Sequence, residues 1–274
     1  MLKARLLTAL VLVLLVVPAL VLLPSVGVAL LLLAMVGVAG FEWQRLSGCR
    51  SRTAAWVYPL ALVGLSLATM PLALSTANHW WLPVSASIWW LGITAFLIRY
   101  RSLLPGSPGR SLGLIMGVIT IVPSWFALVH IHAAFGPLYL LFTFALVWVA
   151  DSGAYFAGKN FGRTKLAPAI SPGKTIEGVV GGAALVFVYG TLAGWFFAGS
   201  VAAGLALGVI SVGVGLLSIS GDLLVSLFKR QQGMKDSGRI LPGHGGILDR
   251  VDSLLAAAPV MLLGLEWLVV SGWQ

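Results

Sequence analysis

Charged residues and cysteine are both scarce in this sequence. Asp, Glu, Lys and Arg make up 9% of the 274 residues, whereas hydrophobic residues make up 59%, and this balance excludes an ordinary soluble domain. The single cysteine, Cys49, cannot form a disulfide within the chain, so the fold must be stabilised by packing. Regular alternation of polar and apolar residues is also absent, which excludes an outer-membrane barrel. Helices remain as the structures that can span a membrane.

Long apolar runs recur along the chain, and each has about the 20 residues that an α-helix needs to cross a bilayer. We therefore expect an all-α, polytopic integral membrane protein with about nine transmembrane helices. The expected ranges are Leu6–Leu23, Ser25–Phe41, Thr53–Leu74, Pro83–Ile98, Ser111–His130, about Phe135 to beyond Ala150, Thr175–Phe197, Val201–Phe228 and Ser253–Ser271. The first run could also be a signal peptide, but no small-residue cleavage site follows it, and we treat it as an uncleaved helix.

Positive charge falls on one side of these helices. All 17 Lys and Arg residues lie at the N-terminus or in the loops after the second, fourth, sixth and eighth expected helices. The positive-inside rule then places the N-terminus in the cytoplasm and the C-terminus outside. Eight or ten helices would put a basic loop on the wrong side. We divide the chain into N-terminal membrane helices, 1–134, and catalytic membrane helices, 135–274, with cytoplasmic loops at 159–174 and 229–252.

Six of the eight carboxylates lie in the second half of the chain, between residues 151 and 252. A carboxylate inside a membrane helix costs roughly 2.5–3.5 kcal/mol on insertion scales, so each one suggests a function. Asp222 shares a helix face with Ser226 and Lys229, at i, i+4 and i+7. Asp249 and Asp252, spaced i, i+3, begin the last helix. Carboxylates from two such helices suit Mg²⁺, which prefers oxygen ligands and takes water and phosphate as the others.

Structural roles stay open for several of these carboxylates. Asp222 could instead pair with a lysine and join two helices, and Asp252 could cap the helix that starts at Ser253. Asp151 could line the cavity or form a salt bridge with Lys174. Three further carboxylates are expected at a helix N-terminus (Glu177) or at the membrane interface without a specific role (Glu42 and Glu266).

Basic residues crowd the segment 229–252 and the loop before it. Attraction of lipid headgroups could be the sole role of such a cluster. That role does not explain the aspartates and glycines that lie among the cations. Glycines on both sides of His244 let backbone N–H groups approach an anion, and His244 could donate to a phosphate oxygen or act as a base. Ser171-Pro172 leads into the helix over Thr175–Phe197, whose N-terminal amides can hold phosphate with Lys174 assisting.

The residues from Ser226 to Asp252 resemble the signature of the phosphatidate cytidylyltransferases (CDP-diacylglycerol synthases). The shared pattern is S-x-apolar-K-R-x4-K-D followed by P-x-H-G-G-x2-D-R-x-D, and every position matches. The resemblance extends back to Asp151-Ser-Gly-Ala-Tyr155 and to Ser171-Pro-Gly-Lys174-Thr175. The first 140 residues resemble the family only in forming membrane helices.

This resemblance implies transfer of CMP from CTP to phosphatidate with Mg²⁺ as cofactor and room for a second cation. It implies catalytic roles for Asp222, Lys229, Arg230 and Asp249, and metal binding by Asp222 and Asp249, with Asp252 and Asp151 as further candidates. The implied substrate-binding residues are Lys174, Ser226, Lys235, Arg239, His244, Gly245, Gly246 and Arg250.

The expected location is a bacterial inner membrane with the active site at the cytoplasmic face. The expected partners are the two substrates and the lipid bilayer, with no nucleic acid and with a homodimer as one arrangement. The rival functions are a CTP-dependent lipid kinase and a transporter of a phosphorylated solute, although repeats and charged outer loops are both missing.

Overall fold

The chain is almost entirely helical in the computed structural model, which describes residues 14–49, 51–75, 77, 79–100, 106–240 and 245–272. The helices are α2 (Ser25–Leu46), α3 (Ala54–Ala73), α4 (Trp81–Arg99), α5 (Arg110–His130), η1 (Ile131–Phe135), α6 (Pro137–Phe161), α7 (Ile176–Ala198), α8 (Val201–Gln231) and α9 (Leu248–Val270). Residues 14–22, part of the first expected run, are helical as well. Within the described ranges, eight helices are long and apolar enough to cross a membrane. The predicted all-α membrane architecture is confirmed.

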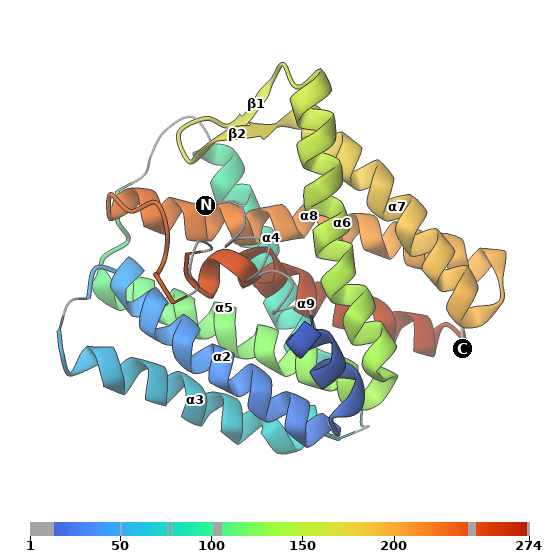
Figure 1. Ribbon diagram of the computed structural model, residues 1–274, viewed down its shortest axis with the longest axis horizontal. Coiled ribbons are helices and arrows are strands. Elements are labelled where there is room, and N and C mark those ends of the chain that lie inside the picture. Colours follow the sequence, from blue (N-terminus) through green and yellow to red (C-terminus); the bar gives the residue numbers. More distant parts are fainter. Residues whose placement is uncertain are drawn as a thin grey trace.

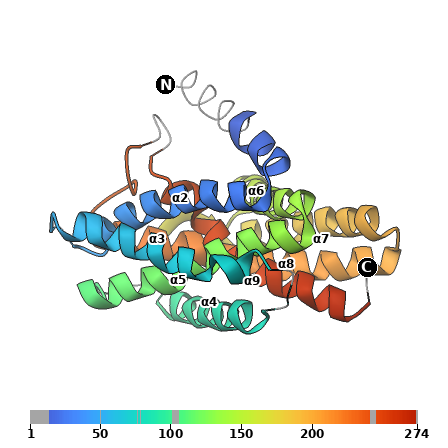
Figure 2. The same ribbon diagram turned by 90° about the horizontal axis from the view of Figure 1, so that it is seen from below.

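Helix α9 lies at the centre of the molecule. It packs against α2, α4, α5, α6 and α8. On one side of it α6, α7 and α8 contact one another, and on the other side α2, α3 and α5 do the same (Figure 1). Turned by 90°, the molecule shows α4 on the face opposite the helix of residues 14–22 (Figure 2). A residue near the start of α9 can therefore contact both groups of helices.

Small residues bring neighbouring helices into backbone contact, as is common in membrane bundles. At Gly204 of α8 an added Cβ would lie 2.7 Å from the carbonyl oxygen of Thr191 in α7. At Gly221 an added Cβ would overlap the carbonyl of Asp252 in α9. The second contact places Asp222, the next residue of α8, beside the first turns of α9.

The segment 159–174, expected as a loop, is partly regular structure. Helix α6 continues to Phe161, and the strands β1 (Lys165–Ala167) and β2 (Ser171–Thr175) form an antiparallel hairpin. Ser171-Pro172 leads into the next helix as expected, but it does so within strand β2, which ends at Thr175 immediately before α7. The hydroxyl of Thr175 caps α7 by accepting a hydrogen bond from the amide of Gly178 at 3.1 Å.

Glu177 fastens this hairpin to the first turn of α7. Its carboxylate accepts hydrogen bonds from the backbone amides of Arg163, at 3.0 Å, and Thr164, at 3.1 Å. The expected location at a helix N-terminus is confirmed, and the side chain accepts hydrogen bonds from amides of the residues that connect α6 to β1.

Helix α9 begins five residues earlier than expected, at Leu248 rather than Ser253. Asp252 consequently lies inside the helix, and the interpretation of Asp252 as its N-cap is wrong. The early start of α9 is explained by a residue of another helix, because a side chain of α2 accepts hydrogen bonds from the amides of Ile247 and Leu248. A helix can start where its first free N–H groups find acceptors.

The contact between α7 and α8 leads to a prediction on stability. Gly204→Ala should destabilise the protein by about 1–3 kcal/mol, because its Cβ must displace the Thr191 carbonyl or separate the two helices. The matched control is Gly213→Ala on the same helix, where an added Cβ meets no atom within 4 Å. Thermal unfolding of both variants in one detergent compares them, and equal midpoints would contradict close packing at Gly204.

Candidate active site

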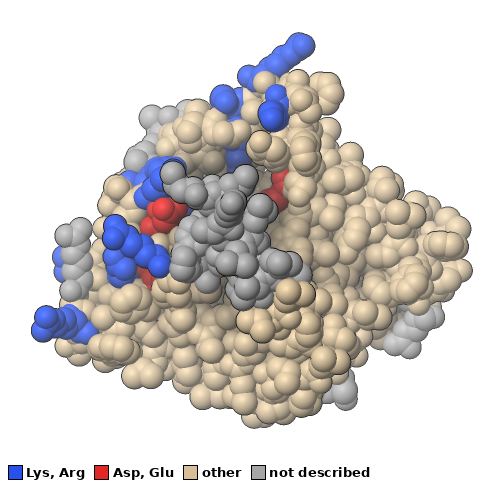
Figure 3. All heavy atoms as spheres, viewed as in Figure 1, with Lys and Arg blue, Asp and Glu red and all other residues tan. Residues whose placement is uncertain are grey.

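The charged side chains in view gather at the end of the bundle away from the C-terminal end of α9 (Figures 1 and 3). Figure 3 shows Lys and Arg gathered over the hairpin and the end of α8, with acidic side chains between them. The candidate site therefore involves α8, α9, the β1–β2 hairpin and the end of α2.

Asp222 of α8 joins that helix to the hairpin. Its Oδ2 lies 2.5 Å from Nζ of Lys174 in β2, and its Oδ1 accepts a hydrogen bond from the hydroxyl of Ser226 at 3.1 Å. The lysine pairing considered for Asp222 is therefore present. Asp222 also lies beside the cations of the signature, a location that suits a role in binding a metal ion or substrate.

A cavity of about 420 Å³ opens beside this pair, between α6, α7, α8 and β2. Lys174 and Asp151 line it, and so do Tyr155 and Lys159 of α6. Asp151 thus lines the cavity, as one of its two interpretations proposed, whereas Lys174 pairs with Asp222 instead. Most of the remaining wall is apolar, formed by small or aliphatic residues of α6, α7 and α8: Ala150, Ala154, Val179, Ala183, Leu216 and Ile219.

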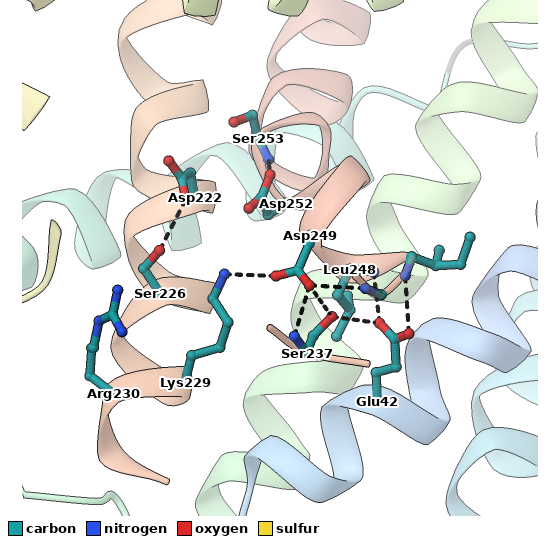
Figure 4. A network of polar contacts seen from close by, with 12 residues as sticks. Glu42, Asp222, Ser226, Lys229, Arg230, Ser237, Leu248, Asp249, Asp252 and Ser253 are labelled. Atoms are coloured by element: carbon teal, nitrogen blue, oxygen red, sulfur yellow. Dashed lines mark hydrogen bonds and ion pairs between the residues drawn. The ribbon is translucent and has the colours of Figure 1, made fainter. Parts of the chain in front are cut away.

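Asp249 has donors on both of its oxygens. Its Oδ1 lies 2.7 Å from Nζ of the buried Lys229 on α8. Its Oδ2 accepts hydrogen bonds from the amide and the hydroxyl of Ser237, at 2.8 and 3.0 Å, and from the amide of Gly246, at 3.0 Å (Figure 4). One carboxylate thereby fastens both ends of the segment 237–246 to α8.

Asp252 differs from the other two aspartates. Its Oδ1 accepts a hydrogen bond from the amide of Ser253 at 2.8 Å, and it has no Lys or Arg partner in the part of the chain that the structure describes. Asp252 lies close enough to Asp222 for their charges to interact (Figure 4). These two residues, from α8 and α9, form a pair of neighbouring carboxylates from two helices.

The remaining predicted site residues are mostly at the surface. Arg230 is exposed, and its Nε makes a long contact of 3.4 Å with the carbonyl of Ile170. Lys229 and Arg230 both extend back along α8 toward Ser226 and Asp222 (Figure 4). Three further predicted substrate-binding cations are exposed around them: Lys235, Arg239 and Arg250.

The predicted glycine-rich segment is only partly described. His244 lies outside the described residues. Gly245 has a positive φ of 82°, a conformation that glycine adopts without strain. The amide of Gly246, which we expected to approach a phosphate, donates to the carboxylate of Asp249.

Glu42 is the residue of this region that sequence analysis missed. We expected it at the membrane interface, but its exposed fraction is 1%. It accepts hydrogen bonds from the amides of Ile247 and Leu248, at 3.0 and 2.8 Å, and from the hydroxyl of Ser237, at 2.7 Å. The only available signal was a lone carboxylate near the end of an apolar helix. Glu266, also expected at the interface, is buried too and lies 3.7 Å from Nε2 of His130.

Known proteins match either the whole of this chain or slightly less than half of it. The model of the cytidylyltransferase family matches residues 3–268. A phosphatidate cytidylyltransferase of Pseudomonas aeruginosa is 39% identical over 282 residues, which cover 100% of this chain and 99% of the relative. Proteins of the same name from Haemophilus influenzae and Brucella suis are 48% and 49% identical over 134 and 131 residues, or 45% and 47% of this chain and 44% and 47% of those relatives.

The Lys174–Asp222 pair leads to a prediction on energetic coupling. Lys174→Gln and Asp222→Asn should each destabilise the protein, and the double variant should lose less than the sum, with a coupling of about 0.5–3 kcal/mol. The control is a second cycle that combines Lys159→Gln with Asp222→Asn. Lys159 lines the same cavity, but it contacts Tyr155 rather than Asp222. Unfolding free energies in detergent test this double-mutant cycle, and additive losses for Lys174 and Asp222 would contradict the pairing.

Proposed function

The chain belongs to the cytidylyltransferase family, and from that premise we propose that it transfers CMP from CTP to phosphatidate. The products are CDP-diacylglycerol and pyrophosphate, which makes the protein a nucleotidyltransferase of phospholipid biosynthesis. The observation that carries the proposal is the cavity beside Lys174 and Asp222, because it joins a mostly apolar wall to a charged end. A phospholipid substrate has the same two parts.

Phosphatidate fits this cavity with its phosphate at the charged end. Lys174 and Lys159 supply positive charge there, while the aliphatic side chains of α6, α7 and α8 suit acyl chains. Lys174 already neutralises Asp222. A lipid phosphate that contacts the same ammonium group would therefore lie next to the aspartate and to the end of α8.

CTP fits the region between α8, the hairpin and the start of α9. Lys229 and Arg230 extend toward Asp222 along α8 (Figure 4), and a triphosphate placed there would meet both. Arg230 offers a planar fork of donors, whereas Lys229 offers a compact charge. Lys235, Arg239, Arg250, Ser226 and the 244–246 segment remain predicted contacts to substrate.

The reaction needs positioning and charge compensation more than a base. An oxygen of the lipid phosphate, which is already anionic near neutral pH, forms a bond to the α-phosphorus of CTP. The bond from that phosphorus to the oxygen bridging to the β-phosphorus breaks, and pyrophosphate leaves with the electron pair. Lys229 and Arg230 would offset the charge that develops on pyrophosphate.

The acidic residues fit Mg²⁺ as cofactor. Asp222 and Asp252 come from two helices in contact, and Asp252 lacks a Lys or Arg partner among the described residues. Mg²⁺ is commonly held by one or two carboxylates together with substrate phosphates; when bound, it would draw negative charge from the triphosphate oxygens. Within the described ranges, no three His, Cys, Asp or Glu side chains form a group that could hold a metal ion by themselves, so substrate phosphates would have to supply further ligands.

Asp249 and Asp151 remain predicted ligands of the first or a second cation. The oxygens of Asp249 contact Lys229, Ser237 and Gly246. Metal binding by Asp249 would require these contacts to rearrange. The cavity position of Asp151 requires no such change.

The protein is an integral membrane protein, and we place it in a bacterial inner membrane with the site at the cytoplasmic face. The distribution of Lys and Arg along the sequence supports that orientation. A homodimer remains a prediction.

Activity gives the first test of this function. Purified protein incubated with labelled CTP, phosphatidate and Mg²⁺ should form a lipid that carries CMP, and Asp222→Asn should lower the rate at least about 100-fold. Lys159→Gln, in the same cavity, should have a smaller effect, since Lys159 has no part in the Asp222 pair. Transfer of phosphate alone to the lipid would instead indicate a CTP-dependent kinase.

The cations of α8 give a second test. Lys229→Gln and Arg230→Gln should each lower kcat/KM about 100-fold or more, because a charge-assisted bond to phosphate is lost from a partly dry site. Arg99→Gln serves as the control, since Arg99 ends α4 outside the signature, and it should change kcat/KM little at low or high salt. If all three variants lost kcat/KM equally, and if the loss depended on the salt concentration, the phosphate site would lie elsewhere.

A further inference from the structure

Glu42 is a buried carboxylate supplied to the site by the N-terminal half of the chain. Its donors are two backbone amides and a hydroxyl, with no Lys or Arg among those that the structure describes. Ile247 and Leu248 stand at the N-terminus of α9, where amide groups lack partners within the helix. The positive end of the helix dipole also favours a carboxylate there. Glu42 therefore caps α9 from another helix.

Ser237 connects Glu42 to the predicted catalytic residues. Its hydroxyl lies 2.7 Å from Oε2 of Glu42 and 3.0 Å from Oδ2 of Asp249, and its amide donates to the same oxygen of Asp249. Asp249 in turn accepts from Lys229. A continuous set of contacts thus runs from α2 through Glu42, Ser237 and Asp249 to Lys229 on α8 (Figure 4).

The backbone at Gly238 and at Gly246 lies close against the Glu42 carboxylate. A Cβ added at Gly238 would overlap Oε1 of Glu42, and one added at Gly246 would overlap both carboxylate oxygens and the hydroxyl of Ser237. Ser237 itself is fully buried. The carboxylate thus lies in contact with both described ends of the segment.

We propose that Glu42 is a positioning residue of the transferase site, a proposal that rests on the function proposed above. Glu42 fixes the start of α9 and the residues at 237–238 and 246, and through them it holds Asp249 against Lys229 and directs that ammonium group along α8. Glu42 touches no reacting atom. The N-terminal helices accordingly contribute to the active site in addition to spanning the membrane.

Glu42→Gln is the test variant, because it keeps the shape of the side chain but removes one acceptor. Each carboxylate oxygen accepts a backbone amide, so an amino group in place of either oxygen would face an N–H group. We expect kcat to fall about 100-fold, the effect of a shift of about 1 Å in a reacting group, while KM for CTP changes less than about threefold. The control is Glu266→Gln, another buried carboxylate, 17 residues beyond Asp249 along α9, and it should keep the wild-type kcat.

Trypsin cleavage gives a readout that does not depend on activity. Arg239 is exposed within the segment that Glu42 holds, so Glu42→Gln should speed cleavage after Arg239 at least about tenfold by raising the population of the opened segment. The thermal unfolding midpoint should fall by only a few degrees, because one buried hydrogen bond is lost while the helices keep their apolar contacts. Unchanged cleavage together with a kcat within threefold of wild type would overturn the proposal.

Ser237→Ala tests the same path if Glu42→Gln fails to fold. It removes the shared hydroxyl without adding volume, and it should lower kcat about tenfold; wild-type kcat in this variant would also overturn the proposal. In the double variant the two losses should not multiply, because both residues act through Asp249, and multiplied losses would count against a shared path. If the wild-type protein formed no lipid-linked CMP, the proposed function would be refuted. The trypsin comparison would still test whether Glu42 holds the residues around Arg239.

Discussion

A carboxylate buried among helices needs donors, and the polar end of this bundle is organised around that requirement. The desolvation of such a group costs several kcal/mol unless nearby donors or cations compensate for it. Asp222 is compensated by Lys174 of the hairpin, Asp249 by Lys229 of α8, and Glu42 by the amides that begin α9. In each case the donor belongs to a different element from the carboxylate, so compensation also joins the elements.

The same requirement relates structure to the proposed chemistry. CTP and phosphatidate are both polyanions, and a site built only of lysines and arginines would gather uncompensated positive charge at the membrane edge before they bind. Pairing Lys174 and Lys229 with aspartates holds these cations in place while limiting that repulsion. The exposed Arg230, whose contact with the carbonyl of Ile170 is long, adds a positive charge that is not paired with any carboxylate of the described residues.

Regular features of the fold could be predicted because each depends on a short stretch of sequence. A run of about 20 apolar residues must form a helix in a membrane, where backbone groups find no water. The i, i+4, i+7 spacing likewise placed Asp222, Ser226 and Lys229 on one face of α8, and the hydrogen bond between Ser226 and Asp222 agrees with it. The β1–β2 hairpin was missed because β1 has only three residues and β2 includes proline and glycine, which weaken any strand pattern.

The sequence alone therefore determined the helical membrane architecture, the family signature and the clustering of charge, since all three depend on residue types and their spacing. Only the tertiary structure decided which charges meet. Lys174 pairs with Asp222 rather than Asp151, and α9 starts at Leu248 because Glu42 accepts its first amides from 205 and 206 residues away in the chain. Contacts over such separations arise when the packing of α2, α8 and α9 brings their ends together, and no local pattern encodes them.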